Sequence, residues 1–482
     1  MGFAIFLDSN AQHSSGRFDL ITAAPAALLA DPQHCHQWAQ LSADLHADLS
    51  GPLSFEAAAP ELIAADINAI NTDARAHTLL GDALQRYTST GASHSQAPFV
   101  SGVIGVCSYD FGMRLNSLTP HHRSQHAAEH RWPELYLGIY QWAIVQDHQQ
   151  QQAWLLADPK QADKTTQALL SLVTTSRHPT TSSLAPLRCL APWQSSASQS
   201  QYAELFYRAI DYIRQGDCYQ INLAQQMSAP YSGDSWLAYQ QLRDISPTPF
   251  AAYIELPQQQ LLSLSPERFI RVVDRQVTTQ PIKGTRKRSM SRQEDIKLVA
   301  ELSDSAKDRA ENLMIVDLMR NDLGKCCEQG SIDVPVLFQI ESHPNVHHMV
   351  STVTGTLPEH TGQPAVYSVL ELLASALPGG SVTGAPKKRA MEIIDELESF
   401  NRSIYCGSVV YINNDGNMDS SILIRSLLCE QDSAANSERD ALRCGTIRCW
   451  GGGGIVADSK AELEYEESLQ KIRNLLQALA ID

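Results

Sequence analysis

The N-terminal part of the chain alternates between short apolar runs and polar, alanine-rich stretches. Continuous apolar runs at 2–7, 99–107 and 135–146 predict β-strands. Alanine-rich stretches between these runs, for example 54–69, predict helices. This part of the chain is therefore expected to contribute both strands and helices.

Residues 171–200 are rich in Ser, Thr and Pro, which is the composition of a linker. They divide the chain into an N-terminal region at 1–170 and a second region at 201–482. We find no internal repeat. The sequence therefore predicts two regions of unequal length joined by a linker.

The pattern is clearer after residue 200. Apolar residues recur at helical spacing at 201–215, at roughly 292–319 and from about 460 onward. Apolar or alternating runs predict strands at 218–229, in a hairpin of “FAAYIEL” and “QLLSLSPERFIRVV” (260–273), and at 404–412, 419–429 and 443–449. Antiparallel strands mixed with helices predict an α+β fold, an α/β sandwich, rather than a doubly wound parallel sheet.

Composition narrows the possible partners. The 482 residues carry a formal net charge of −16, which argues against nucleic acid and against an anionic membrane surface. A small anionic substrate remains possible because its binding depends on local charge. We see no apolar run of about 18 residues and no signal peptide, and the ten cysteines include no CxxC pair. These features predict a cytoplasmic protein with reduced cysteines and no membrane span.

Two pairs of acidic residues have helical spacing. Asp308 and Glu311 are separated by three positions in one predicted helix, and Glu464 and Glu467 repeat that spacing in the last one. Each pair therefore shares one helix face. The four carboxylates could converge on a hard cation such as Mg²⁺, which prefers oxygen ligands. On spacing alone, two solvated helix faces are the more common explanation.

Two glycine-rich segments allow a ligand to approach the backbone. “PGGSVTGAPK” (378–387) precedes a predicted helix, whose N-terminus favours an anion, but it lacks the spacing of a P-loop. “WGGGGIVADS” (450–459) is predicted to be a turn. A sharp turn without a ligand would explain either segment equally well.

Three other residues invite both a functional and a structural interpretation. Arg425 lies in the alternating run “SSILIRSLL”, where its natural use is to bind a carboxylate or to occupy a sheet edge. Lys471 follows Glu467 by four positions, so a simple ion pair is expected. His348 should point away from the face of His347 in a strand, and a lone strand histidine is more often structural than catalytic.

The segment “PIKGT” (281–285) places Lys283 before a Gly-Thr pair. Its amine could be an ordinary surface ammonium. It could also be held in a pocket, where partial desolvation lowers the pKa and frees the amine as a nucleophile. The segment alone leaves both alternatives open.

Taken together, these segments resemble one family, the chorismate-utilising enzymes. The resemblance covers 201–482 densely and the N-terminal region more loosely, through “GRFDLITAAP” and “GVIGVCSYDFG”. The family's fold is a sandwich of two large antiparallel sheets with helices outside. The motifs that carry the resemblance are “SPERF” (265–269), “PIKGT” (281–285), “DRAENLMIVDLMRNDLG” (308–324), “HHMVSTVTG” (347–355), “PGGSVTGAPKKRAMEIIDELE” (378–398), “YCGSVVYI” (405–412), “MDSSILIR” (418–425), “GGGGIVADS” (451–459) and “EYEESLQKIRN” (464–474).

The resemblance implies a magnesium site. Glu311 and Glu467 match the family's Mg²⁺ ligands, with Asp308 and Glu464 close by. The cation would hold the carboxylate on the chorismate ring.

The resemblance also implies a substrate-binding set. Arg425 and Tyr405 would bind the enolpyruvyl carboxylate, together with backbone N–H groups near Gly453 and Gly454. Lys471 would support carboxylate binding. The remaining matches are Thr383 and Gly384, near the ring, and His348, near the reacting edge.

Two positions distinguish branches of the family. Where the isochorismate- and salicylate-forming members have a lysine that activates water, this chain has Gln220, which favours ammonia as the nucleophile. “PIKGT” resembles the members that aminate chorismate to 4-amino-4-deoxychorismate, in which Lys283 would attack C2. Glu267, in “SPERF”, would then be the general acid that protonates the C4 hydroxyl.

The resemblance implies partners as well. We see no glutaminase segment, so a separate glutamine amidotransferase subunit is expected to supply ammonia. A separate lyase would convert the product to 4-aminobenzoate for folate synthesis. Two alternatives remain: an anthranilate-forming enzyme, and a non-catalytic subunit that binds chorismate or tryptophan.

Overall fold

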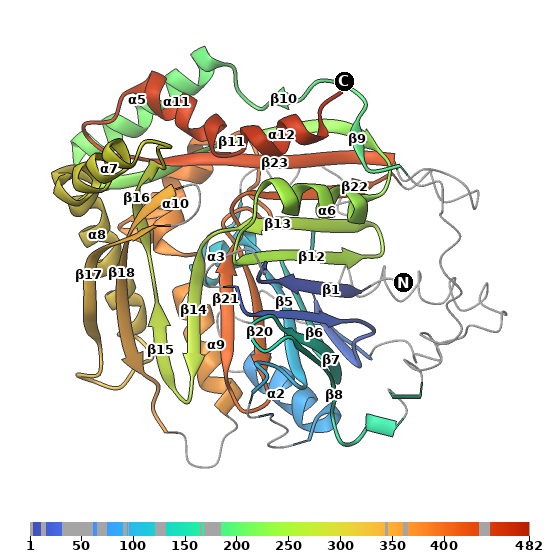
Figure 1. Cartoon of the computed structure of the whole chain (residues 1–482). Helices are drawn as coiled ribbons and strands as arrows, with labels where there is room; N and C mark the ends of the chain where they lie inside the picture. The colour runs from blue at the N-terminus through green and yellow to red at the C-terminus, as the bar shows by residue number, and fades with distance from the viewer. Residues whose placement is uncertain are drawn as a thin grey trace.

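Two large β-sheets, of twelve and eleven strands, pack against each other in this computed structural model (Figure 1). The predicted α+β sandwich is confirmed, and β3 with β4 is the one parallel pair among the described strands. In Figure 1 the strands of the first sheet run across the page and those of the second run up and down it. The structure describes residues 3–10, 16–30, 61–64, 75–89, 94, 96–120, 132–163, 166–167, 185–342, 346–359, 365–432 and 444–481.

The first sheet combines strands from both ends of the chain. Helices cover its outer face and bury two apolar clusters there. The strand order is β10 (Gln194–Ser195), β11 (Gln220–Ser232), β23 (Cys444–Ile455), β22 (Ser426–Gln431), β13 (Gln259–Ser265), β12 (Phe250–Leu256), β1 (Ala4–Asp8), β2 (Phe18–Thr22), β7 (Trp142–Asp147) and β8 (Gln152–Ala157), with β19 (Gly384–Ala385) and β9 (Arg188–Cys189) also paired to β11. The helices are α5 (Gln199–Gln215), α6 (Ser235–Ile245), α10 (Lys387–Leu397), α11 (Ala461–Gln470) and α12 (Arg473–Leu479).

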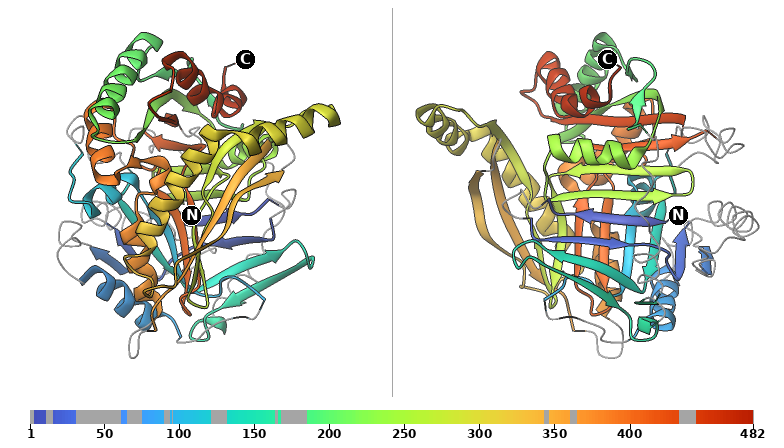
Figure 2. Two further views of the ribbon diagram at one scale, coloured as in Figure 1. Left: turned by 90° about the vertical axis from the view of Figure 1, so that its left-hand side faces the viewer. Right: turned by 45° about the vertical axis from the view of Figure 1, so that its right-hand side comes forward.

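The second sheet faces the first across the largest apolar core. Its order is β16 (Ile282–Lys287), β18 (Val346–Thr356), β15 (Gln276–Thr279), β14 (Arg268–Val273), β21 (Met418–Ile422), β20 (Ser408–Asn413), β5 (Gly102–Cys107), β6 (Leu135–Tyr140), β3 (Ala27–Ala30) and β4 (Glu61–Ala64), with β17 (Asp333–Ser342) also paired to β18. The helices near it are α2 (Arg75–Tyr87), α3 (Tyr109–Leu115), α7 (Arg292–Asp304), α8 (Ala306–Leu323) and α9 (Ala365–Ala376). Figure 2 shows α7 extending away from the sheets at one end of the molecule.

Two runs that we expected to be single strands instead pass from one sheet to the other. The run 260–273 divides into β13 and β14, and the run 419–429 divides into β21 and β22. The two crossings lie side by side, since Leu264 N donates to Arg425 O at 3.0 Å and Ile422 N donates to Glu267 O at 3.1 Å. Glu267 and Arg425 are therefore placed where the sheets meet.

The long helix predicted at 292–319 is in fact two helices, α7 and α8. The chain leaves the helical conformation at Ser305, whose ψ is 106°. The Ser305 hydroxyl then accepts a hydrogen bond from Asp308 N at 3.2 Å and caps α8. Serine competes for backbone hydrogen bonds in this way, which explains why it ends one helix and begins the next.

Two further expectations were wrong. The glycine run predicted as a turn at 450–459 lies largely in β23, where Gly451 to Gly454 pair with β11. Part of the predicted helix 54–69 is the strand β4, which pairs with β3, and the rest of that range lies outside the described residues. In both places pairing with a distant strand overrides local propensity.

The two predicted regions are interleaved in space. The region 1–170 contributes β1, β2, β7 and β8 to the first sheet, and β3 to β6 to the second. Nearly half of the predicted linker, at 171–184, lies outside the described residues, and β9 and β10 occupy part of the remainder. The boundaries at 170 and 201 stay a prediction about the sequence.

One stretch, Ala365–Val382, is long and apolar enough to cross a membrane by length and composition alone. We had expected no apolar run of about this length. The stretch begins with α9, which packs against α2, α8 and β20, and 67% of it is buried. Burial on several sides explains its composition, as in the core helices of globular proteins.

Candidate active site

Four consecutive glycines of β23, Gly451 to Gly454, form a stretch of backbone without side chains. Several polar side chains approach this glycine strip. β22 pairs with β23 only as far as Cys449, so the glycines extend beyond that neighbour. A Cβ atom on Gly452 would lie 2.8 Å from the Tyr405 hydroxyl, and one on Gly453 would lie 3.3 Å from Glu464 Oε2. Any larger residue would therefore fill the space in front of these side chains.

Gly454 marks the position of the predicted nucleophile. A Cβ atom there would lie 3.4 Å from Lys283 Nζ and 3.2 Å from Gln220 Nε2. Lys283 comes from the second sheet, whereas Gly454 and Gln220 belong to the first. The two sheets thus bring these three residues together at the glycine strip.

Lys283 is positioned by an irregularity in β16. The register against β18 shifts between Ile282 and Thr285, and Gly284 between them has a φ of +82°. A Cβ atom on Gly284 would come within 3.0 Å of Asp308 on α8, so only glycine allows this close approach.

The Lys283 amine makes no hydrogen bond or ion pair with any residue that the structure describes. Burial lowers the pKa of Lys283 from its ordinary value, opposed by the nearby Glu311 carboxylate. Desolvation disfavours the charged ammonium, and this is the condition that frees an amine as a nucleophile.

Glu267 is buried at the crossing between β13 and β14, with 8% of its surface exposed. Burial raises the pKa of its carboxyl group, whereas the Ser381 hydrogen bond and the Lys283 charge oppose the rise. The Ser381 hydroxyl donates to Glu267 Oε1 at 2.9 Å. A carboxyl group that keeps its proton toward neutral pH is suited to donating one.

Arg425 and Tyr405 are the predicted binding residues for a substrate carboxylate. The Arg425 guanidinium makes no hydrogen bond or ion pair within the described part of the chain. Burial lowers the pKa of Arg425, and the nearby Glu267 charge opposes this shift. Its backbone φ of +51° is unusual for arginine. Tyr405 stacks on Trp450, with ring centroids 6.2 Å apart. A partly buried guanidinium that forms no ion pair with the described residues favours binding of an anionic group.

Gln220 is fully buried, and neither atom of its side-chain amide has a hydrogen-bond partner within the described residues. Asn222, two positions along β11, has an unpartnered Nδ2 atom. Buried amides are normally hydrogen-bonded. Two unsatisfied amides on the same strand therefore point to a polar ligand at this site.

Three of the four predicted acidic residues interact across the site. Burial raises the pKa of Glu311 and of Glu464, and the Glu467 charge adds to both shifts. For Glu467 itself, burial would raise the pKa, but Lys471 at 2.9 Å lowers it overall. Neighbouring carboxylates that repel one another fit a hard cation, because a cation removes that repulsion.

The four acidic side chains do not surround a single point, as the ligands of a bound metal ion would. Among the described residues, no three His, Cys, Asp or Glu side chains form a ready metal-binding group. Asp308 pairs with Arg286 at 3.0 Å, and its charge also raises the pKa of Glu311. Lys307 lies 3.8 Å from Glu311, while Lys471 Nζ donates to Gly452 O at 2.9 Å. A cation held by Glu311, Glu464 and Glu467 would displace the Lys307 and Lys471 amines from these contacts.

The two histidines point to different partners, as expected for neighbours in a strand. His347 contacts Asp295 at 3.0 Å and Ser342 at 2.7 Å, which is a structural role. His348 Nδ1 lies 2.9 Å from Thr285 Oγ1, two residues beyond Lys283 on β16. His348 therefore belongs to the same edge of the site as the lysine.

Thr383 and Gly384 lie beside Gln220 but are held by the backbone. The Thr383 hydroxyl donates to Gly379 O at 3.0 Å, and Asn222 N donates to Thr383 O at 2.7 Å. Gly384, whose φ is +152°, packs against the Gln220 carbonyl. This segment shapes the wall behind Gln220.

Three residues that support this site were not predicted from the sequence. Ser381 donates to Glu267, and Ser459 Oγ donates to Glu464 Oε1 at 2.7 Å. Asn222 adds the second unpartnered amide. Both serines lie within glycine-rich segments noted above, but nothing in a single sequence shows which carboxylate each one meets.

A separate cavity of about 380 Å³ lies between the sheets, lined partly by Leu7, Ser9, Phe18, Phe250 and Tyr411. None of the predicted site residues lines it. The cavity is therefore distinct from the glycine strip.

Comparison with protein families matches residues 47–477 to the chorismate binding enzyme model. The aminodeoxychorismate synthase component 1 of Klebsiella aerogenes is 39% identical over 99% of this chain and 94% of its own length. The protein of the same name from Escherichia coli is 43% identical over 83% of this chain and 82% of its own length. The anthranilate synthase component 1 of Aquifex aeolicus is 39% identical over 60% of this chain and 55% of its own length.

Solved structures show the same fold. Anthranilate synthase component I from Streptococcus pneumoniae superposes with a TM-score of 0.67 at 27% identity, covering 83% of this chain and 85% of that one. The menaquinone-specific isochorismate synthase MenF from Escherichia coli gives a TM-score of 0.65 at 15% identity, covering 99% and 88%. The second likeness concerns the fold alone.

Proposed function

The chain belongs to the family of chorismate-binding enzymes, and we propose that it is the component 1 that converts chorismate and ammonia to 4-amino-4-deoxychorismate. The Klebsiella aerogenes and Escherichia coli proteins of that name match 99% and 83% of the chain, whereas the anthranilate synthase of Aquifex aeolicus matches 60% of it. The single observation that carries the proposal is the unpaired Lys283 amine beside Gly454, with its pKa lowered by burial.

The first step is a displacement at the chorismate ring. The neutral Lys283 amine attacks C2, the ring double bonds shift, and the C4 hydroxyl leaves as water with a proton from Glu267. A covalent adduct through the lysine nitrogen results. Splitting one difficult substitution into two steps is the usual advantage of a nucleophilic side chain.

The second step reverses the shift. Ammonia attacks C4, the double bonds return to their original positions, and the C2–nitrogen bond breaks to release Lys283. The ammonium formed at C4 returns a proton to the Glu267 carboxylate, which leaves an amine at C4 and restores the acid. Because C2 is blocked by the lysine, ammonia is directed away from the position that leads to anthranilate.

The remaining residues would bind and orient chorismate. Arg425 and Tyr405 are proposed to hold the enolpyruvyl carboxylate against the glycine strip, and Lys471 adds positive charge there. The unpartnered Gln220 amide supports a role in holding ammonia or a ring substituent beside Lys283. His348, Thr383 and Gly384 would complete the pocket wall.

A bound Mg²⁺ would be held by Glu311 and Glu467, with Glu464 nearby, and would neutralise the ring carboxylate. Asp308 would stay paired with Arg286. The repulsion of the Glu467 charge on Glu311 and Glu464 supports this assignment.

Removal of Mg²⁺ with a chelator should abolish amination, and added Mg²⁺ should restore it. Glu311→Gln should raise the Mg²⁺ concentration for half-maximal activity at least about tenfold, because one charged ligand is lost. Steady-state assays over a Mg²⁺ titration measure this shift. Glu462→Gln is the matched control, since Glu462 is exposed on α11. Full activity after chelation would contradict the proposal.

The function itself is tested by mass spectrometry of products from the purified chain with chorismate, Mg²⁺ and ammonium. We expect a product with one hydroxyl exchanged for an amine and the enolpyruvyl group retained. Anthranilate with free pyruvate would establish the alternative amination instead. Chorismate left unchanged, but bound, would favour the non-catalytic subunit.

The name component 1 on the relatives supports a partner. We propose that a glutamine amidotransferase subunit supplies ammonia, that the pair acts in the cytoplasm, and that a separate lyase takes the product toward 4-aminobenzoate and folate. Neither nucleic acid nor a membrane is proposed as a partner.

A further inference from the structure

We propose that Lys387 and Asp322 form a positioning pair that holds the loop 377–386 and, through Ser381, the carboxyl group of Glu267. The pair touches neither Lys283 nor the carboxylates assigned to the cation. It acts at a distance from the reacting atoms, by fixing the segment that carries the Ser381 hydroxyl. The inference rests on the proposed role of Glu267 as general acid.

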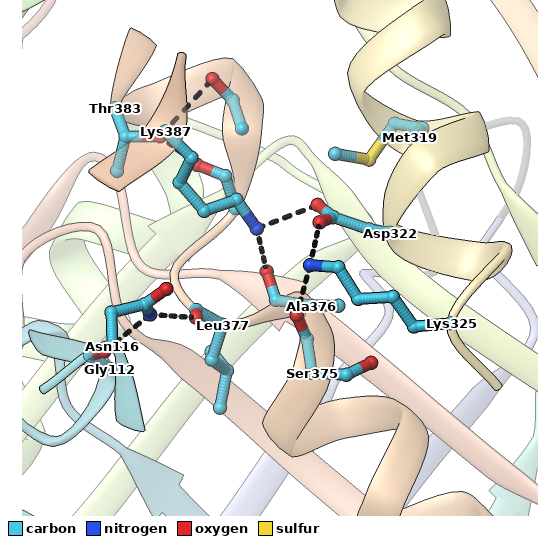
Figure 3. A network of polar contacts seen from close by, with 12 residues as sticks. Gly112, Asn116, Met319, Asp322, Lys325, Ser375, Ala376, Leu377, Thr383 and Lys387 are labelled. Atoms are coloured by element: carbon cyan, nitrogen blue, oxygen red, sulfur yellow. Dashed lines mark hydrogen bonds and ion pairs between the residues drawn. The ribbon is translucent and has the colours of Figure 1, made fainter. Parts of the chain in front are cut away.

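The Lys387 ammonium joins three segments of the chain. Its Nζ atom donates to Asp322 Oδ2 at 2.6 Å and to Ala376 O at 2.7 Å (Figure 3). Ala376 is the last residue of α9, and Lys387 is the first residue of α10. One ammonium therefore ties together the two ends of the loop between these helices and fastens both to α8.

The loop has one more anchor at its start. The side chain of Asn116, which ends α3, donates from Nδ2 to Leu377 O at 3.1 Å and to Gly112 O at 2.8 Å (Figure 3). Beyond this anchor, the loop reaches the site through Ser381. The loop 377–386 is thus held at both of its ends, and Ser381 in its middle contacts Glu267.

Both members of the pair are buried, with side-chain exposures of 10% for Lys387 and 4% for Asp322. A buried ion pair contributes little net stability compared with an apolar pair of similar volume, because both charges lose their hydration. It does specify one geometry, since each charge needs the other. Such a pair at the base of a loop that contacts a catalytic carboxyl is suited to positioning.

Ser381 is the link from the loop to the chemistry. Its hydroxyl donates to Glu267 Oε1 at 2.9 Å and so selects one orientation of that carboxyl group. Displacement of a catalytic group by about 1 Å can lower a rate by about a hundredfold. Movement of the loop base would therefore displace the carboxyl group of Glu267.

The test is a double-mutant cycle on kcat with Lys387→Met and Ser381→Ala. Lys387→Met should lower kcat by about 10- to 100-fold. If the pair acts through Ser381, Ser381→Ala should have almost no further effect in the Lys387→Met background. Fold-losses that multiply would overturn the proposal, because independent sites are additive in free energy.

Lys325→Met is the matched control. Lys325 also pairs with Asp322, at 3.0 Å, but its side chain is 49% exposed, and it donates only weakly, at 3.4 Å, to Ser375 O on one side of the loop without reaching the other side. Its kcat should stay within about twofold of the unmodified enzyme, because exposed ion pairs contribute little. If Lys325→Met lowered kcat as much as Lys387→Met does, the effect would come from the charge around Asp322, and the positioning role would be overturned.

Lys387→Met leaves an unpaired buried carboxylate, so folding must be tested separately. The double variant Asp322→Leu with Lys387→Met removes both charges, and its melting temperature should return toward that of the unmodified enzyme. Its kcat should stay low. Recovery of kcat together with stability would show a purely structural pair.

Glu267→Gln separates failure of this inference from failure of the proposed function. If Glu267→Gln leaves kcat unchanged, the general-acid role fails. If it lowers kcat strongly but the Lys387 and Ser381 effects multiply, only the positioning pair fails.

Discussion

Replacement of Lys283 by alanine should lower kcat/KM for amination of chorismate by about a thousandfold or more, the scale expected when a covalent nucleophile is lost. The amine lies beside Gly454 without a hydrogen-bond partner among the described residues, and burial lowers its pKa. Lys283→Arg should be equally inactive, because a guanidinium stays protonated and is a poor nucleophile. Rates with ammonium as the nitrogen source, followed by mass spectrometry, measure the loss.

The control for this variant is Lys287→Ala, which removes an exposed lysine from the same strand and should retain activity. Chorismate binding to Lys283→Ala, measured by calorimetry with Mg²⁺, should persist, so that the loss lies in the chemical step. A kcat/KM within a few-fold of the unmodified enzyme would exclude the covalent mechanism.

The pH profile of the unmodified enzyme provides a second readout. The amine must be neutral to attack, so the rate should rise with pH through the pKa of Lys283. Because burial lowers that pKa, the rise should occur at lower pH than for an exposed lysine, whose pKa is about 10.4. A rise only near that ordinary value would contradict a buried nucleophile.

Local patterns predicted the fold class and most of the elements, but not the places where the chain changes sheets. The runs 260–273 and 419–429 are interrupted at the crossings only by “SPER” (265–268) and “RS” (425–426), which are short enough to fit within a single strand. Pro266 is the one local indication of the first crossing, since proline cannot donate to a strand ladder. The pairing of β13 with β22, and of β14 with β21, places both crossings.

The site shows the same division between local and distant information. Helical spacing predicted that Glu464 and Glu467 share a face, and that Lys471 pairs with Glu467. The approach of Lys283 to Gly454 depends on two sheets meeting, and the pairing of Asp308 with Arg286 depends on how β16 packs on α8. A single sequence contains no record of such distances, so family resemblance was needed to assemble the site.

Substitution of Glu267 by glutamine should lower kcat by about 100- to 10,000-fold, the usual contribution of a general acid. The C4 hydroxyl is a poor leaving group until it is protonated, and Glu267 is buried where its pKa is raised. Glutamine keeps the size of the side chain and an oxygen acceptor for Ser381, but it has no acidic proton to give. Steady-state kinetics with ammonium measure the change, and Glu294→Gln, at an exposed position on α7, is the control.

The pH dependence distinguishes loss of the acid from a general disturbance of the site. The carboxyl group must be protonated to act, so the rate of the unmodified enzyme should fall as pH rises through the pKa of Glu267. Because burial raises that pKa, the fall should lie above the ordinary value of about 4.3. Glu267→Gln should lose this descending limb while keeping the ascending one that belongs to Lys283. A variant that is slow but retains both limbs would assign proton donation to another group, and an unchanged kcat would remove Glu267 from the mechanism.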